Sequence, residues 1–232
     1  MIFLLNSSLL GKYLLHKNAI AIIVIALWII TILVIAFLFK RYFPNKEELS
    51  RKIIHIGTGP VILLAWLFDI PKNIAFFSAF FITIALGINY KFRLLPAIED
   101  IERKSLGTIG YGISITLLLL LFWPRYTSSI SIGVLSMAFG DGLAGLIGRS
   151  INSPKWSVLG QTKSMAGTFT MSSVVAITTT TISSINNLNI QPIEIIVISL
   201  IATVLEQISP WGIDNITVPI GVTCIGIWLI GI

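Results

Sequence analysis

The sequence is poor in charged residues. Of its 232 residues, 11% are Asp, Glu, Lys or Arg, whereas a soluble domain usually has about 25%. Hydrophobic residues make up 55%, and the mean hydropathy is +0.93. This composition excludes an ordinary soluble domain and predicts a protein that crosses a membrane several times. The length suits one domain, and we find no linker, low-complexity tail or internal repeat.

Cysteine is almost absent. With Cys224 alone, an intrachain disulfide is excluded, and one buried thiol makes a poor metal site. We expect Cys224 to be a small core residue in the last apolar stretch. A soluble basic domain is absent as well, so the formal net charge of +6 does not point to nucleic acid as a partner. Attraction to anionic membrane lipids accounts for part of that charge.

Apolar stretches are abundant, and a spanning helix needs roughly 20 mostly apolar residues. The sequence therefore predicts an all-α fold, a polytopic transmembrane helical bundle with seven or eight spans. Residues 1–17 have no small-residue cleavage site after a compact apolar core, so we interpret them as a short interfacial segment and not as a cleaved signal. The candidate spans are 18–39, 53–69, 73–90, 107–123, 128–148, 165–185, 192–209 and 215–232.

Most of the 16 Lys and Arg residues fall in loops that an eight-span chain places on one side of the membrane. The positive-inside rule makes that side cytoplasmic and puts the N-terminus outside. Several of these cations stand at or near helix ends, where they can bind a polyphosphate. The cations of this side are Lys40, Arg41, Lys46, Arg51, Lys52, Lys91, Arg93, Arg103, Lys104, Arg149, Lys155 and Lys163.

A first polar cluster begins the second candidate span. Residues 48–59 read ELSRKIIHIGTG, and Arg51 and His55 share one helical face, with Lys52 beside them. Taken alone, this cluster is better explained by a positive-inside anchor with a structural histidine.

A second polar cluster, residues 99–112, reads EDIERKSLGTIGYG. It is a charged loop that leads into a glycine-rich helix start, and exposed helix N-termini bind phosphate well. A solvated loop explains the two acidic residues at its beginning. Arg103, Lys104 and Thr108 are the candidates for phosphate binding.

A third cluster places a carboxylate inside an apolar stretch. Residues 136–149 read SMAFGDGLAGLIGR, and Asp141 is expected within the bilayer or at its edge. A carboxylate there costs a few kcal/mol, so it usually faces a polar cavity and has a function. The structural alternatives are an ion pair with Arg149 or Lys163, or a helix cap.

Two short motifs in this region resemble nucleotide-binding loops but fail the full patterns. Gly140, Gly142 and Gly145 match G-x-G-x-x-G without a preceding strand, so packing between membrane helices explains them better. The stretch GQTKS at 160–164 lacks the spacing of a P-loop. A soluble-type nucleotide fold is therefore excluded, although Lys163 remains a candidate phosphate ligand.

A fourth cluster, residues 205–219, reads LEQISPWGIDNITVP and contains Glu206, Asp214 and Asn215. Carboxylate and amide oxygens suit Mg²⁺, while a helix-start cap explains Asp214 or Asn215 alone nearly as well. Together, the four clusters suit Mg²⁺-nucleotide phosphoryl transfer, in which catalysis is mainly positioning and charge neutralisation. The apolar spans would supply a lipid-soluble acceptor.

With these clusters in view, the sequence resembles the phytol kinase and dolichol kinase family of CTP-dependent lipid kinases, which is distantly similar to the phosphatidate cytidylyltransferases. The resemblance runs from about Arg51 to Pro219 and rests, in order, on RKIIH, ERKSLGT, GDGLAGLIGR, KSMAGT and DNITVP. It implies transfer of phosphate from a nucleoside triphosphate, typically CTP, to an isoprenoid alcohol. The compact length looks more like phytol kinases, which favours phytol. The family's motif residues map to Gly140, Asp141, Ala144, Gly148, Arg149, Lys163, Ser164 and Gly167.

The resemblance and the residue chemistry together predict roles. Asp141 binds Mg²⁺ or orients the acceptor hydroxyl, and Asp214 and Asn215 complete the metal or nucleotide site. The triphosphate is neutralised by Lys163, Arg149 and Lys52, and His55 is the candidate for activation of the hydroxyl. The further predicted nucleotide or phosphate ligands are Arg51, Arg103, Lys104, Gly140, Ser164 and Gly167, with Glu206 as an additional polar group of the site.

We expect residues 1–232 to form one integral membrane domain, with an N-terminal segment and first span in 1–50, a catalytic core in 51–219 and a last span in 215–232. The expected location is the cell or thylakoid membrane, with the active site on the cytoplasmic face. One alternative is a cytidylyltransferase, or a kinase of another lipid such as polyprenol or diacylglycerol. The other is a transporter, which would carry polar residues along whole spans at mid-membrane depth.

Overall fold

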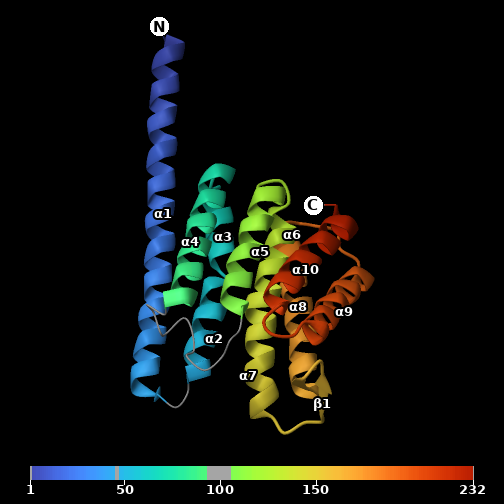
Figure 1. Ribbon diagram of the computed structural model, residues 1–232. Helices are drawn as coiled ribbons and strands as arrows, with labels where there is room; N and C mark the ends of the chain where they lie inside the picture. Colours follow the sequence, from blue (N-terminus) through green and yellow to red (C-terminus); the bar gives the residue numbers. More distant parts are fainter. Residues whose placement is uncertain (1, 45–46, 93–105, 232) are drawn as a thin grey trace.

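The fold is that of a computed structural model that describes residues 2–44, 47–92 and 106–231, and it confirms the all-α class (Figure 1). The elements in chain order are α1 (Ile2–Tyr42), α2 (Glu47–Thr58), α3 (Val61–Leu67), α4 (Lys72–Phe92), α5 (Gly107–Phe122), α6 (Thr127–Leu135), the π-helical turn η2 (Ser136–Asp141), α7 (Gly142–Ser150), β1 (Lys155–Val158), β2 (Gln161–Ser164), α8 (Met165–Ile185), α9 (Pro192–Ile208) and α10 (Asp214–Ile230).

Three helical stretches in the described part of the chain are long and apolar enough to cross a membrane, namely Leu15–Tyr42, Lys72–Phe92 and Thr127–Ser150. Gly107–Phe122 and Asp214–Ile230 are shorter apolar helices. The third long stretch joins α6, η2 and α7 end to end. The number of spans, seven or eight, stays a prediction.

Two segments differ from the predicted spans. The predicted span 53–69 is divided into α2 and α3 at Gly59 and Pro60. Proline lacks the N–H that a continuous helix needs, and a side chain on Gly59 would place its Cβ only 2.6 Å from Ala138. The predicted interfacial segment 1–17 is not separated from the first span, because α1 runs unbroken from Ile2 to Tyr42 and no proline interrupts it. Its location at the membrane interface stays a prediction.

A short hairpin is the element that the sequence did not predict. Strands β1 and β2 pair antiparallel, with Lys155 opposite Ser164 and Val158 opposite Gln161. The two connecting residues, Leu159 and Gly160, both have positive φ, 48° and 77°, as a type I′ hairpin turn requires. The hairpin fixes the position of Lys163 directly before α8.

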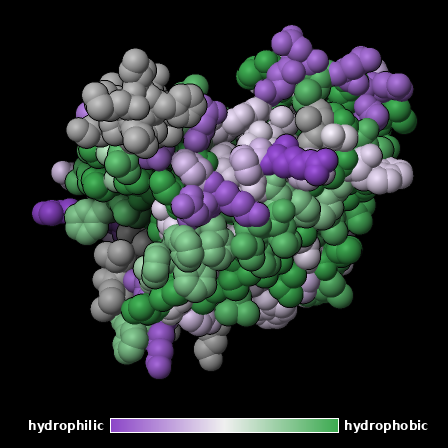
Figure 2. Space-filling view, turned by 90° about the horizontal axis from the view of Figure 1, so that it is seen from above, coloured by the Kyte–Doolittle hydropathy of each residue, from purple (hydrophilic) through white to green (hydrophobic). Residues whose placement is uncertain are grey.

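The remaining helices pack as a bundle in which α4 lies on α5, α10 on α6, and both α7 and α9 on α8. The face seen in Figure 2 has broad hydrophobic areas, with hydrophilic residues gathered in a few groups. Cys224 corrects one expectation, because it is exposed. Its neighbours Val222 and Thr223 are buried in the bundle, so the next position on α10 points outward.

Candidate active site

A cavity of about 1230 Å³ lies among α1, α2, α3, α4, α5, α7, the hairpin and the segment from α9 to α10. Pockets for one small ligand usually measure about 300–1000 Å³, so this one is large enough for two substrates. One half of the cavity is lined mainly by apolar side chains and the other half by charged ones. The apolar half is lined by residues that include Ile22, Ile25, Ile62, Ile74, Ile82 and Leu119, and the charged half by residues that include Glu48, Lys52, Asp141, Lys163, Glu206 and Asp214.

Asp141 lies in the charged half with two partners from α2. Lys52 Nζ donates to Asp141 Oδ2 at 2.8 Å and to the Asp141 carbonyl oxygen at 3.1 Å. His55 Nε2 lies 3.4 Å from the same Oδ2 and 3.3 Å from the Met137 carbonyl oxygen. Because Lys52 and His55 are three residues apart, one face of α2 presents both to the carboxylate.

The structural alternatives predicted for Asp141 are therefore wrong. Its ion-pair partner is Lys52, while Arg149 and Lys163 bind other carboxylates. Its side chain does not cap α7 either. The sequence could not choose among the cations, because Lys52 lies on a different helix, far away in the chain.

Local backbone features bring α2, α7 and α8 close together around Asp141. The π-helical turn η2 ends at Asp141, and such turns occur frequently at functional sites. A Cβ on Gly145 would lie 3.2 Å from Lys52 Nζ, and one on Gly148 would lie 2.6 Å from Ser164 Oγ. Both glycines thus serve close helix packing, which was predicted for Gly145 but not for Gly148.

A second charged group joins the hairpin to the end of α9. Lys163 Nζ forms an ion pair with Glu206 Oε1 and donates to the Glu206 carbonyl oxygen at 2.9 Å. Gln207 Nε2 donates to Glu206 Oε2 at 3.0 Å and to Thr168 Oγ1 at 2.8 Å. Trp156 Nε1 of β1 donates to Gln207 Oε1 at 3.3 Å. The network orients Glu206 and holds the Lys163 ammonium in the cavity wall.

A third group lies at the outer edge of the charged half. Arg149, at the end of α7, forms an ion pair with Glu48 Oε2 of α2, and Arg51 lies 3.6 Å from Glu48 Oε1. Each cation of these three groups thus has a carboxylate partner, which offsets the cost of removing its charge from water. An anionic ligand that enters the charged half would compete with these carboxylates for the same cations.

Asp214 and Asn215 lie at the start of α10 and face the same cavity. Asp214 Oδ1 accepts from the Asn215 backbone N–H at 2.9 Å and from Asn215 Nδ2 at 3.2 Å, and Nδ2 also donates to the Gly212 carbonyl oxygen at 3.3 Å. Asn215 Oδ1, in contrast, is buried without a hydrogen-bond partner in the described structure. A buried acceptor without a partner is costly, so this oxygen is a candidate ligand for a cation.

The side chains of the cavity would bind a magnesium ion only together with other ligands. Residues 2–44, 47–92 and 106–231 contain no group of three His, Cys, Asp or Glu side chains arranged to hold a metal ion. Mg²⁺, however, is usually bound by one or two carboxylates together with substrate phosphates and waters. Asp141, Asp214 and Asn215 line the same cavity and carry oxygen atoms of this kind, so a magnesium site that substrate phosphates complete stays a prediction.

Most predicted site residues line this one cavity. Gly140 does not, because it packs against Met171, whose Sδ would lie 2.6 Å from a Cβ at that position. Arg103 and Lys104 lie outside the described residues. The predicted residues that do line the cavity include Arg51, Lys52, His55, Thr108, Asp141, Arg149, Lys163, Ser164, Gly167, Glu206, Asp214 and Asn215.

Three residues of the site were not predicted. Glu48 and Gln207 lie within quoted polar clusters, but their importance depends on partners that are distant in sequence. Tyr111, from the glycine-rich start of α5, lies next to His55 with ring centroids 5.1 Å apart, and its hydroxyl lies 3.4 Å from Thr58 Oγ1. An aromatic residue between two glycines was the available signal for Tyr111.

Several known proteins are similar to this chain. It is 35% identical over 209 residues to a phytol kinase of Synechocystis sp., covering 87% of this chain and 88% of that protein. It is 27% identical to a probable chloroplastic phytol kinase of Triticum aestivum, over 80% of this chain and 69% of that protein. No family model matches the chain. No solved structure matches it either.

Proposed function

The chain belongs to the phytol kinase family, and from this membership and the geometry of its cavity we propose that it transfers the γ-phosphate of CTP to phytol. The observation that carries the proposal is the continuity of the two halves of the cavity. A water-soluble, highly charged donor and a lipid acceptor need different surroundings but must meet at one point. The junction at Asp141, His55 and Tyr111 provides that point.

The proposed reaction is an in-line displacement at the γ-phosphorus. The hydroxyl oxygen of the lipid forms a new bond to phosphorus, the bond from phosphorus to the β,γ-bridging oxygen breaks, and CDP leaves. His55 accepts the hydroxyl proton, and its contact with Asp141 Oδ2 at 3.4 Å orients the imidazole and stabilises its positive charge. Lys52 and Lys163 neutralise charge on the phosphates, the main contribution that a protein makes to this reaction.

Asp141, Asp214 and Asn215 are the residues that would hold Mg²⁺. When bound, the ion would neutralise charge on the phosphate oxygens. Glu206 keeps Lys163 in the cavity wall, and Arg149 and Arg51 bind the outer phosphates or the nucleoside. We propose that the charged half faces the cytoplasm, since the surrounding loops carry most of the basic residues, and that the protein resides in a cell or thylakoid membrane.

The experiment that tests this proposal uses purified protein in lipid nanodiscs, with CTP, UTP, GTP or ATP as donor. The acceptors are phytol, farnesol, a polyprenol and diacylglycerol. We expect phytyl phosphate and CDP as the main products. Pyrophosphate with a CDP-lipid would identify a cytidylyltransferase instead. Absence of any nucleotide-dependent product would reject enzymatic phosphoryl transfer.

A further inference from the structure

We infer that the isoprenoid alcohol enters the cavity laterally, from the bilayer, through an opening between α1 and α4. This inference deepens the proposed function and rests on it. Both helices line the apolar half, α1 with residues that include Ile22, Ala26 and Ile29, and α4 with residues that include Ala79 and Ile82. Each helix therefore forms one side of the space in which a lipid tail would lie.

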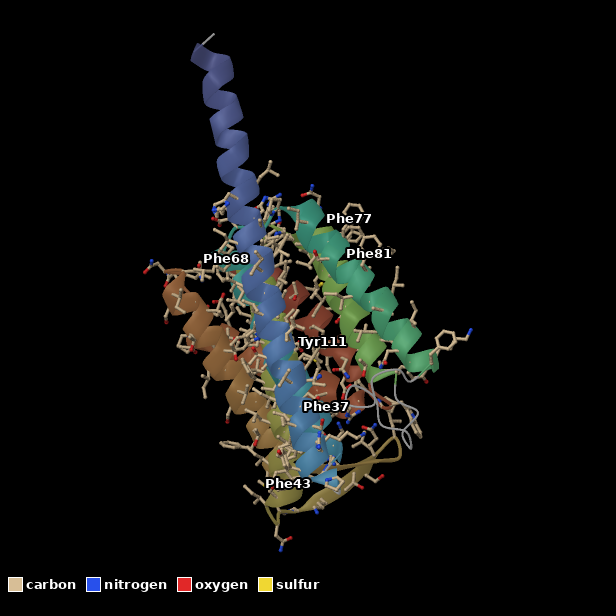
Figure 3. The ribbon with its side chains drawn as sticks, turned by 90° about the vertical axis from the view of Figure 1, so that its left-hand side faces the viewer. Phe37, Phe43, Phe68, Phe77, Phe81 and Tyr111 are labelled. Atoms are coloured by element: carbon tan, nitrogen blue, oxygen red, sulfur yellow. The ribbon has the colours of Figure 1, made fainter. Side chains whose placement is uncertain are left out.

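The two helices pack mainly on other helices and not on each other. Helix α1 packs on α2 and α3, and α4 packs on α5. In the described part of the chain, α1 and α4 are not among the helix pairs in close contact. Figure 3 views this side directly, and Tyr111 of α5 appears between the two helices. The side of the cavity between α1 and α4 is therefore the side where two wall-forming helices are not packed against each other.

The residues along this opening belong to the cavity and to the outer surface at once. Ile22 is 47% exposed and Ile82 is 49% exposed, although both line the cavity. On the outside, α4 carries Phe77 and Phe81, which project away from α1 (Figure 3) and are exposed. An opening bordered by apolar side chains favours an apolar tail and disfavours a triphosphate.

The inner end of this path leads to the reacting groups. Tyr111 and Thr58 line the cavity beside His55, so they mark the change from apolar to charged lining. An alcohol that slides in from the bilayer can therefore bring its hydroxyl to Asp141 and His55 while its tail stays between α1 and α4. The nucleotide, in contrast, would reach the same point from the side of Arg149, Lys155 and the hairpin.

The test uses tryptophan substitutions that narrow the opening. Ala26→Trp on α1 and Ala79→Trp on α4 place large side chains in the apolar half. Leu27→Trp and Phe77→Trp are the matched controls, because these residues are exposed on the same helices and do not line the cavity. We expect the first two variants to raise the KM for phytol about tenfold or more, with the KM for CTP unchanged. The controls should behave like the unmodified protein.

A second measurement uses the unmodified protein and so does not depend on how the variants fold. A phytol analogue with a photoreactive diazirine in the middle of its tail should label peptides of α1 and α4, and excess phytol should prevent the labelling. If Ala26→Trp and Ala79→Trp keep the KM for phytol, or if the label falls on α6, α8 or α9, lateral entry is wrong. Failure of the unmodified protein to phosphorylate any lipid alcohol would reject the proposed function, which is a separate result.

Discussion

Lys52 Nζ and Asp141 Oδ2 form an ion pair at 2.8 Å between residues that lie 89 positions apart in the chain. The side chains are 9% and 16% exposed. A buried ion pair gains little net stability, because both charges must be removed from water. Its place at the junction of the apolar and charged halves therefore indicates a functional reason for keeping it.

The first prediction concerns the carboxylate of this pair. Asp141→Asn should abolish phosphoryl transfer, because the amide lacks the negative charge that holds Mg²⁺ and stabilises the imidazolium of His55. The Asn side chain can still accept from Lys52, so the variant should insert and fold, although loss of the carboxylate beside the buried Lys52 costs stability. Turnover of phytol in nanodiscs, together with the elution profile of the purified variant, measures both effects.

The matched control for this variant is Asp69→Asn. Asp69 also pairs with a lysine, Lys17, at 2.8 Å, but it is exposed and does not line the cavity. Its variant should keep full activity. A well-folded Asp141→Asn protein with near-normal turnover would remove Asp141 from the reaction.

The second prediction separates the functional role of Lys163 from its structural role. Lys163→Ala should raise the KM for CTP more than the KM for phytol, because the ammonium binds phosphate. The same change leaves Glu206 buried without its cation, which typically costs about 3–5 kcal/mol of stability. Thermal unfolding in detergent, alongside steady-state kinetics, reports the two effects independently.

Two further variants complete this test. The double variant Lys163→Met with Glu206→Met should regain stability, because both charges are removed together, but it should not regain CTP binding. Lys163→Arg should restore little, since the guanidinium does not reproduce the contacts of the ammonium with Glu206. Recovery of CTP affinity by the uncharged pair would show that Lys163 does not bind the nucleotide.

The third prediction concerns the metal. Asp214→Ala should shift the Mg²⁺ concentration for half-maximal activity upward, because a hard oxygen ligand is lost. Asn215→Leu should do the same, since Asn215 Oδ1 is the buried oxygen without a partner. Asn186→Leu is a control at an amide that does not line the cavity. Unchanged Mg²⁺ dependence in both test variants would contradict the proposed metal site.

The helices were predictable from the sequence where local signals were strong. Helix α8 covers the predicted residues 165–185, because an apolar stretch follows Ser164, whose Oγ accepts from the Gly167 backbone N–H at 3.2 Å as a helix cap. The break at Gly59 and Pro60 also had a local signal, since proline interrupts helices. Residues 53–69 were nevertheless predicted as one span, because the stretch as a whole is apolar.

The pairing of charges was not predictable. Electrostatic energy depends on distance and burial, and neither can be derived from spacing along the chain. Asp141 forms its ion pair with Lys52 of α2, while Arg149, only eight residues further along the chain, pairs with Glu48. The hairpin was missed for a related reason. Strands of four residues with mixed polarity give almost no periodic signal.

The fourth prediction concerns glycine packing next to the site. A Cβ on Gly148 would lie 2.6 Å from Ser164 Oγ and 3.3 Å from Gly167 Cα, so Gly148→Ala should push α7 away from α8 and cost about 1–3 kcal/mol. At Gly87 a Cβ would meet nothing within 4 Å. Gly87→Ala should therefore be neutral or slightly stabilising, because alanine favours helices. Thermal unfolding of the two variants under the same conditions tests the difference.

The fifth prediction concerns orientation in the membrane. Single cysteines at Ser153 and Trp211, in a Cys224→Ser background, should react with a membrane-impermeant maleimide only from the cytoplasmic side. The background change is necessary because Cys224 is exposed. A third position, Ser105, lies outside the described residues and should react from the same side. Labelling of any of them from the opposite side would mean that the spans are miscounted next to that loop.

In the proposed reaction, phosphate and not a nucleotidyl group passes from CTP to a lipid alcohol at Asp141. The most direct measurement uses two samples of CTP, one labelled in its γ-phosphate and one in its α-phosphate, with phytol as acceptor. We expect that lipid-bound label appears only from the γ-labelled sample, and that Asp141→Asn abolishes it. Lipid-bound label from the α-phosphate would show transfer of the nucleotidyl group, and γ-label on phytol that persists in the Asp141→Asn protein would show that Asp141 is not needed for the transfer.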